Sequence, residues 1–134
     1  MKNPKIKKKP TSEVKSRRIM IVDDEPDQRM MIKMILDKEG YETMLAENGS
    51  QFLEKLDTFD PGLVILDVLM PGLTTEEILK QLISKKSKHK IILLTVVKYS
   101  EEALKEIWKK DNIVAYITKP FDLDDLINTI NELV

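Results

Sequence analysis

Five polar residues of this 134-residue chain stand where short apolar runs end, and their side chains could carry chemistry together. The residues are Asp23, Asp24, Asp67, Thr95 and Lys119. Three carboxylates at one place repel one another by about 4 kcal/mol per pair, at about 4 Å and an effective dielectric near 20. A hard divalent cation removes this repulsion, and carboxylate oxygens without Cys or His ligands favour Mg²⁺, with Mn²⁺ as a further option. The pattern therefore predicts a divalent cation site.

The threonine and the lysine suggest what such a site would act on. The Lys119 ammonium is a mobile point charge that suits a phosphoryl group, and the Thr95 hydroxyl can donate to a phosphoryl oxygen. A carboxylate beside these groups, such as Asp67, is a plausible nucleophile that would form an aspartyl phosphate. Each signal alone has a plain structural explanation, because Asp-Asp often caps a helix and Lys-Pro often lies in a loop. Their joint occurrence in this order favours the chemical interpretation.

The apolar runs that precede these residues predict β-strands. Residues 63–66 follow the turn signal Asp60-Pro61-Gly62 and are rich in branched side chains, as in a strand buried on both faces. Residues 19–22, 91–94 and 114–117 have the same character, and residues 42–46 form a weaker fifth candidate.

Amphipathic segments between the runs predict helices. The first begins at Pro26 and ends near Gly40. Its recurring apolar residues are expected to pack in the core: Met30, Met31, Met34 and Ile35. Further helices are predicted after Asn48-Gly49, from a capping box of Thr74 and Glu77, over residues 100–110, and from Asp122. The helix that begins at this Thr74 and Glu77 capping box is expected to bury Ile78, Leu79, Leu82 and Ile83.

Strands and helices alternate five times, which predicts an α/β fold: a flavodoxin-like, doubly wound, five-stranded parallel sheet of order 2-1-3-4-5 with five helices. In a parallel sheet the carboxyl ends of all strands lie at one edge, where ligands bind. The five polar residues should therefore meet in one crevice.

Composition limits the alternatives. The chain has no cysteine and a single histidine, His89, so disulfides, thiolate metal sites and two-histidine metal sites are excluded. His89 lies in the lysine-rich run 85–90, which is predicted to be an exposed loop with the histidine at the surface. The absence of cysteine and of any long apolar run fits a cytoplasmic protein.

Charge divides the chain into a basic tail and an acidic body. Residues 1–18 contain eight Lys or Arg and one acid, whereas residues 19–134 contain 14 basic and 22 acidic residues. We predict a flexible tail over residues 1–17 and one domain over residues 18–134. A solvated tail is the simplest interpretation. The alternatives are contact of the tail with nucleic acid or a membrane, and folding of the tail back onto the acidic body.

Several motifs closely resemble the receiver domain of two-component response regulators: Val-Asp-Asp-Glu-Pro at 22–26, Leu-Asp-Val-Leu-Met-Pro-Gly at 66–72, Thr95, and Tyr-Ile-Thr-Lys-Pro-Phe at 116–121. The resemblance covers about residues 18–134. It implies that Asp67 accepts a phosphoryl group from a phosphohistidine on a sensor histidine kinase or histidine phosphotransfer protein. It also implies that Asp24 and Asp67 bind Mg²⁺ directly, Asp23 through water, and Leu69 through its backbone carbonyl.

The resemblance further implies a switch. Thr95 and Lys119 would hold the phosphoryl oxygens, and Tyr116 would turn inward as Thr95 moves toward the phosphate. A downstream protein would read the altered face, and the chain would be no enzyme beyond its own phosphorylation and dephosphorylation. Dimerisation and the possibility of further domains stay open.

Three apolar residues depart from the family pattern and keep alternatives open. Val96 replaces a very small residue beside the path of the phosphoryl group, so a pseudo-receiver that binds partners without phosphorylation is one alternative. Leu69 and Val97 cannot orient an attacking water, which predicts a long-lived phosphorylated state. A haloacid-dehalogenase-type phosphatase is a further alternative, but it would need a second Asp where Leu69 stands.

Overall fold

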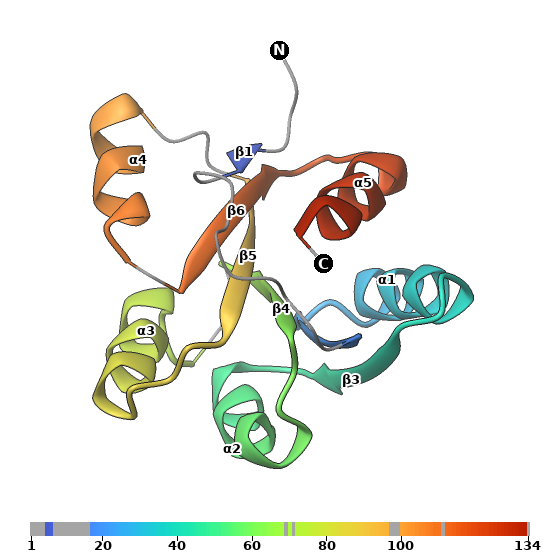
Figure 1. The fold of residues 1–134 in the computed structure, drawn as a ribbon, viewed down its shortest axis with the longest axis horizontal. Coiled ribbons are helices and arrows are strands. Elements are labelled where there is room, and N and C mark those ends of the chain that lie inside the picture. The colour runs from blue at the N-terminus through green and yellow to red at the C-terminus, as the bar shows by residue number, and fades with distance from the viewer. Residues whose placement is uncertain are drawn as a thin grey trace.

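The computed structural model describes residues 5–6, 17–68, 70, 72–96, 100–110 and 112–133. Within these residues one sheet contains six strands in the order β1-β6-β5-β4-β2-β3 (Figure 1). The strands are β1 (Lys5–Ile6), β2 (Arg18–Val22), β3 (Glu42–Ala46), β4 (Leu63–Asp67), β5 (Lys90–Thr95) and β6 (Ile113–Thr118). The five longer strands are parallel, and their order confirms the predicted 2-1-3-4-5 arrangement.

Five helices cover the two faces of the sheet in the described part of the chain. They are α1 (Pro26–Lys38), α2 (Gly49–Phe59), α3 (Thr75–Ser84), α4 (Glu101–Trp108) and α5 (Leu123–Leu133). Helices α1 and α5 lie on one face, and α2, α3 and α4 lie on the other (Figure 1). The predicted capping box of Thr74 and Glu77 forms, and Asn48 caps α2 by accepting from the Gln51 amide.

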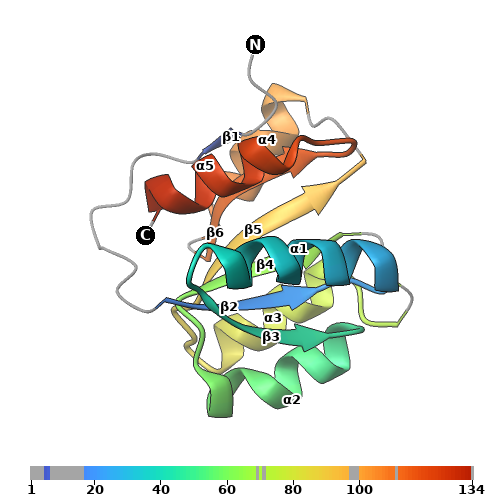
Figure 2. The ribbon, with the colours of Figure 1, turned by 90° about the vertical axis from the view of Figure 1, so that its right-hand side faces the viewer.

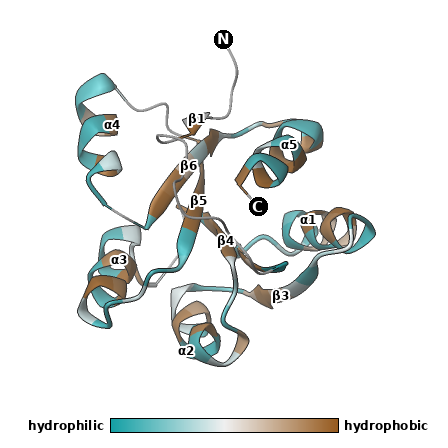
Figure 3. Ribbon diagram, viewed as in Figure 1, coloured by the Kyte–Doolittle hydropathy of each residue, from teal (hydrophilic) through white to brown (hydrophobic). Residues whose placement is uncertain are grey.

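The strands separate two hydrophobic cores because successive side chains point to opposite faces of a sheet. On β2, Ile19 and Ile21 face α1 and α5, whereas Met20 and Val22 face α2 and α3. The central strands consist mainly of hydrophobic residues, and hydrophilic and hydrophobic residues alternate along the helices (Figure 3). Burial on both faces leaves only the strand ends for polar chemistry.

Strand β1 is an addition that the sequence pattern did not predict. It pairs antiparallel with β6, with Lys5 opposite Tyr116 and Ile6 opposite Ala115. The Ile6 side chain is partly buried and packs on the α1 and α5 side of the sheet. Two residues are too few to show the alternating pattern of a strand. This strand forms only because β6 offers an edge for pairing. Residues 7–16 lie outside the described part of the chain, and the division at residues 17 and 18 remains a prediction.

The prediction that the α1 methionines pack in the core was wrong. Met30, Met31 and Met34 are 50%, 45% and 67% exposed, while Ile32 and Leu36 are fully buried. Two positions along a helix correspond to a rotation of about 200°, so the stripe of Ile32 and Leu36 and the methionine stripe lie on nearly opposite sides. The sheet covers only the narrower stripe.

Two further details differ from the expectation. Ile83 is 60% exposed, because it lies one position, about 100° of rotation, beyond the buried Leu82. His89 is not a free surface residue: its Nδ1 lies 2.7 Å from the Ser87 hydroxyl and its Nε2 lies 2.8 Å from Asp60. The histidine therefore ties the loop before β5 to the end of α2.

In the part of the chain that the structure describes, no helix is both long enough and apolar enough to cross a membrane.

Candidate functional site

The five polar residues predicted from the sequence lie at the carboxyl edge of the sheet. Asp23 follows β2, Asp67 ends β4, Thr95 ends β5 and Lys119 follows β6, and these strands point toward one side of the molecule (Figure 2). The ladder continues past the strand ends, because the Lys119 amide donates to the Thr95 carbonyl over 2.7 Å. Parallel pairing has thus brought together residues from four separate segments.

Three carboxylates form the centre of the site. Asp23, Asp24 and Asp67 each offer one oxygen, and these oxygens lie within 4.8 Å of one another. Asp23 is fully buried and Asp67 is 4% exposed, whereas Asp24 is open to solvent. Ionised carboxylates that are buried so close together need a compensating cation. The donor set contains oxygen alone, which fits Mg²⁺ or Mn²⁺.

Protein donors hold both oxygens of Asp23. The Glu25 amide donates to Oδ1 over 2.9 Å, and the Gln28 side-chain amide donates to Oδ2. The Arg29 guanidinium donates to the Asp23 carbonyl over 2.6 Å and lies 3.6 Å from Glu47. With one protein donor on each oxygen, Asp23 is fixed in orientation and suited to accept a further hydrogen bond from a metal-bound water.

Sequence reasoning missed Gln28 and Arg29. Their position in the sequence could have identified them. Both residues lie in the first turn of a helix that begins two residues after Asp24, so their side chains can reach back to the end of β2.

Lys119 contacts the central carboxylate directly. Its Nζ lies 3.2 Å from Oδ1 of Asp67, and the lysine side chain is 21% exposed. Thr95, which ends the neighbouring strand, is fully buried. A cation beside a buried carboxylate lowers the cost of its charge and can stabilise negative charge that develops on a group bound there.

Tyr116 is buried behind Thr95 and Lys119, on the α4 side of the sheet. It is 2% exposed, and its ring centroid lies 6.2 Å from that of Trp108 on α4. On β6 it pairs with Leu93 of β5 on one side and with Lys5 of β1 on the other. A change at this ring would therefore reach α4 and both neighbouring strands.

Of the remaining predicted residues, Leu69 and Val97 lie outside the described part of the chain. Val96 is described, and its side chain is 57% exposed.

Comparisons with known proteins agree with this geometry. Residues 19–131 match the family model of the response regulator receiver domain. Protein PilH of Pseudomonas aeruginosa is 31% identical over 118 residues, which cover 87% of this chain and 97% of PilH. Sporulation initiation phosphotransferase F of Bacillus subtilis is 32% identical, over 86% of this chain and 91% of that protein.

A solved structure gives the same result. Response regulator protein TrrA of Thermotoga maritima, crystallised in complex with Mg²⁺ and BeF, is 38% identical, with a TM-score of 0.72 over 87% of this chain and 98% of TrrA. The match of sequence, fold and strand-end carboxylates leads to one conclusion. The chain belongs to the family of response regulator receiver domains, the phosphorylatable domains of two-component signalling.

Proposed function

We propose that Asp67 is the phosphoryl acceptor of this receiver domain. One Asp67 carboxylate oxygen attacks the phosphorus of a phosphohistidine, the P–N bond breaks, and the imidazole leaves with the bonding electron pair and takes up a proton. The observation that carries the proposal is the position of Asp67, nearly buried, 3.2 Å from the Lys119 ammonium and grouped with two further carboxylates. A lysine at this distance can neutralise charge on the incoming phosphoryl oxygens.

The carboxylate cluster is proposed to hold Mg²⁺, with Mn²⁺ also compatible with its oxygen donors. Asp24 and Asp67 would bind the ion directly, Asp23 through water, and Leu69 through its carbonyl. When bound, the ion supplies positive charge that offsets the carboxylates and the phosphoryl oxygens. The protein's part is to fix Asp23 through Glu25 and Gln28, so that the cluster is already in place.

Phosphorylation of Asp67 is proposed to act on Thr95 and Tyr116. A phosphoryl group adds nearly two negative charges and acceptor oxygens, which attract the Thr95 hydroxyl and Lys119. Strands β5 and β6 are paired up to Thr95 and Thr118, so a shift of Thr95 is passed to the strand that carries Tyr116. A downstream protein would read the resulting face, and the chain would act on no substrate besides its own phosphoryl group.

The exposed methionines of α1 provide a surface for the phosphodonor. Met30, Met31 and Met34 border a hollow with Leu123 of α5, and α1 begins three residues after Asp23. A histidine-bearing helix that presents its phosphoryl group to Asp67 must lie across the mouth of the pocket and therefore beside α1. Methionine side chains adapt well to an apolar helical partner.

The alternative of a phosphorylation-independent module is not favoured, since the matching relatives include a protein named as a phosphotransferase.

Intact-mass spectrometry tests the proposal. The wild type is incubated with a small phosphodonor such as acetyl phosphate, with Mg²⁺ or with EDTA, beside Asp67→Asn and a control, Asp57→Asn, which removes an exposed carboxylate of α2. We expect one added phosphoryl group in the wild type and the control with Mg²⁺ only. A gain in Asp67→Asn would refute Asp67 as acceptor. No gain in any protein that demonstrably binds Mg²⁺ would favour the pseudo-receiver.

A further inference from the structure

A second strongly charged site lies at the opposite edge of the sheet. A hollow of about 880 Å³ is formed between the loop that enters β5, the end of α3 and the turn before β6. Lys90 begins β5 and Thr95 ends it, so the two edges are about 17 Å apart at 3.3 Å per residue. The hollow therefore does not belong to the carboxylate pocket.

Five lysines and one acid line the hollow: Lys86, Lys88, Lys90, Lys109, Lys110 and Glu106. They represent five of the 14 basic residues of an otherwise acidic body. Glu106 pairs with Lys109 at 3.0 Å. Within the described residues, no acidic side chain forms an ion pair with the three loop lysines, Lys86, Lys88 and Lys90. The hollow is therefore a basic region on an otherwise acidic domain.

The loop that carries the three lysines is held in place by a buried side chain. Asn112 is 6% exposed, and its amide donates to the carbonyls of Ser87 and His89 over 3.1 and 2.8 Å. His89 in turn lies 2.8 Å from Asp60, which anchors the far side of the loop. A run of like charges in a free loop would spread apart in water. Here the backbone is fixed at several points, so the lysines stay together.

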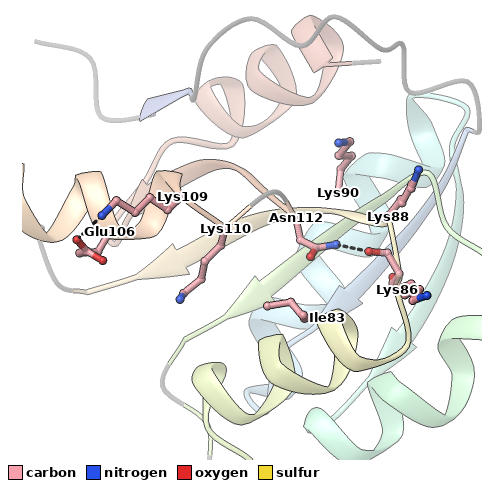
Figure 4. A pocket seen from close by; sticks show the side chains of 9 residues that line it. Ile83, Lys86, Lys88, Lys90, Glu106, Lys109, Lys110 and Asn112 are labelled. Atoms are coloured by element: carbon pink, nitrogen blue, oxygen red, sulfur yellow. Dashed lines mark hydrogen bonds and ion pairs between the residues drawn. The ribbon is translucent and has the colours of Figure 1, made fainter.

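The arrangement of the side chains indicates the kind of ligand. Figure 4 shows Lys110 on the α4 side and the three loop lysines on the other, with Ile83 and Asn112 between them. In this view the lysine side chains point in different directions, and their ammonium groups do not converge on one point. Several linked phosphates fit this spread better than a single one, and lysines act as point charges toward phosphate. Among the described residues that line the hollow none is aromatic, so they offer no platform for base stacking.

We infer that this hollow binds a small ligand that carries a chain of phosphate groups, such as inorganic tripolyphosphate or the triphosphate of a nucleotide. Its volume lies within the roughly 300–1,000 Å³ of small-molecule sites. The inference is independent of the function proposed for Asp67, because it involves none of the residues of that pocket.

Calorimetric titration of the full chain with tripolyphosphate and with ATP, without Mg²⁺, tests the inference. The test variant combines Lys86→Gln, Lys88→Gln and Lys90→Gln. The matched control combines Lys80→Gln, Lys85→Gln and Lys105→Gln, which removes the same charge from nearby lysines that do not line the hollow. We expect saturable binding by the wild type and the control, and binding at least about tenfold weaker in the test variant. Equal affinity for both probes would assign recognition to the phosphate chain, and tighter binding of ATP would assign it to a nucleotide.

Amide chemical shifts locate the bound probe. The inference requires perturbations at residues 86–90 and at Asn112. Perturbations confined to residues 1–18 would place binding on the basic tail and overturn the inference. The absence of saturable binding, or an equal loss of affinity in both triple variants, would also overturn it. An oligonucleotide that binds through the same lysines more tightly than either small probe would refute the small-ligand assignment in favour of a nucleic-acid surface.

Discussion

Replacement of Asp24 by Asn should stabilise the metal-free protein and abolish its response to Mg²⁺. The three carboxylate oxygens lie within 4.8 Å of one another. At this separation and an effective dielectric near 20, each pair repels by about 3–4 kcal/mol. Because Asp24 is exposed, solvent screens much of this repulsion, so we expect a gain of about 1 kcal/mol in the free energy of unfolding.

Magnesium should reverse the order of stability. An ion that binds only the folded wild type stabilises it by about 1.4 kcal/mol at ten times its dissociation constant, and more at higher concentration. Asp24→Asn lacks one of the proposed direct ligands and should gain little. The variant should therefore be the more stable protein in EDTA and the less stable protein in excess Mg²⁺.

Urea unfolding in EDTA and in Mg²⁺, at matched ionic strength, measures both effects. Matched ionic strength is needed because salt alone screens carboxylate repulsion. Glu54→Gln on the exposed side of α2 is the control, and it should respond to Mg²⁺ as the wild type does. The reasoning fails if Asp24→Asn is destabilised in EDTA, because the three carboxylates would then not be in mutual repulsion. It also fails if the variant and the wild type gain equally from Mg²⁺.

Three further predictions concern other parts of the chain. Met34→Lys should slow phosphorylation by a histidine-bearing donor about tenfold or more and leave the rate with acetyl phosphate unchanged, because only the protein donor covers α1; equal rates with both donors would remove α1 from the docking surface. Leu69→Asn and Val97→Glu, measured by the decay of the phosphorylated mass peak, should each shorten the lifetime of the phosphorylated state by supplying a group that orients water; unchanged lifetimes in both variants would contradict this explanation. The hydrogen bond from Lys33 to Asp37 lowers the pKa of that carboxyl below its usual 3.8, so the pair stabilises the fold above that pH and the contribution is lost as the pH falls through the lowered folded-state pKa. In this acidic range the free energy of unfolding of Asp37→Asn should depend less on pH than that of the wild type. An identical pH dependence in the two proteins would count against the linkage.

The sequence by itself determined the parallel sheet and the location of its site. Apolar runs such as residues 63–66 can be buried only between two layers of helices, and alternation of strand and helix forces them to run parallel. Once the strands are parallel, the residues that follow them must meet at one edge. The sequence alone therefore places Asp67, Thr95 and Lys119 together.

The sequence alone could not decide which face of α1 is buried. Met34 and Leu36 are both apolar and lie in the same helix, but one is 67% exposed and the other is fully buried. Helical periodicity identifies both stripes, and only the position of the sheet and of α5 decides which one is covered.

The tertiary structure alone decided the contacts that depend on distant partners. Gln28 and Arg29 became part of the site because α1 folds back over the end of β2, and β1 exists because the edge of β6 offers unpaired backbone groups. The lysines of the loop before β5 became the rim of a hollow because Asn112, from another segment, holds that loop. Local sequence fixes the periodicity and the ends of each element, whereas these contacts join residues whose separation along the chain leaves no local signal.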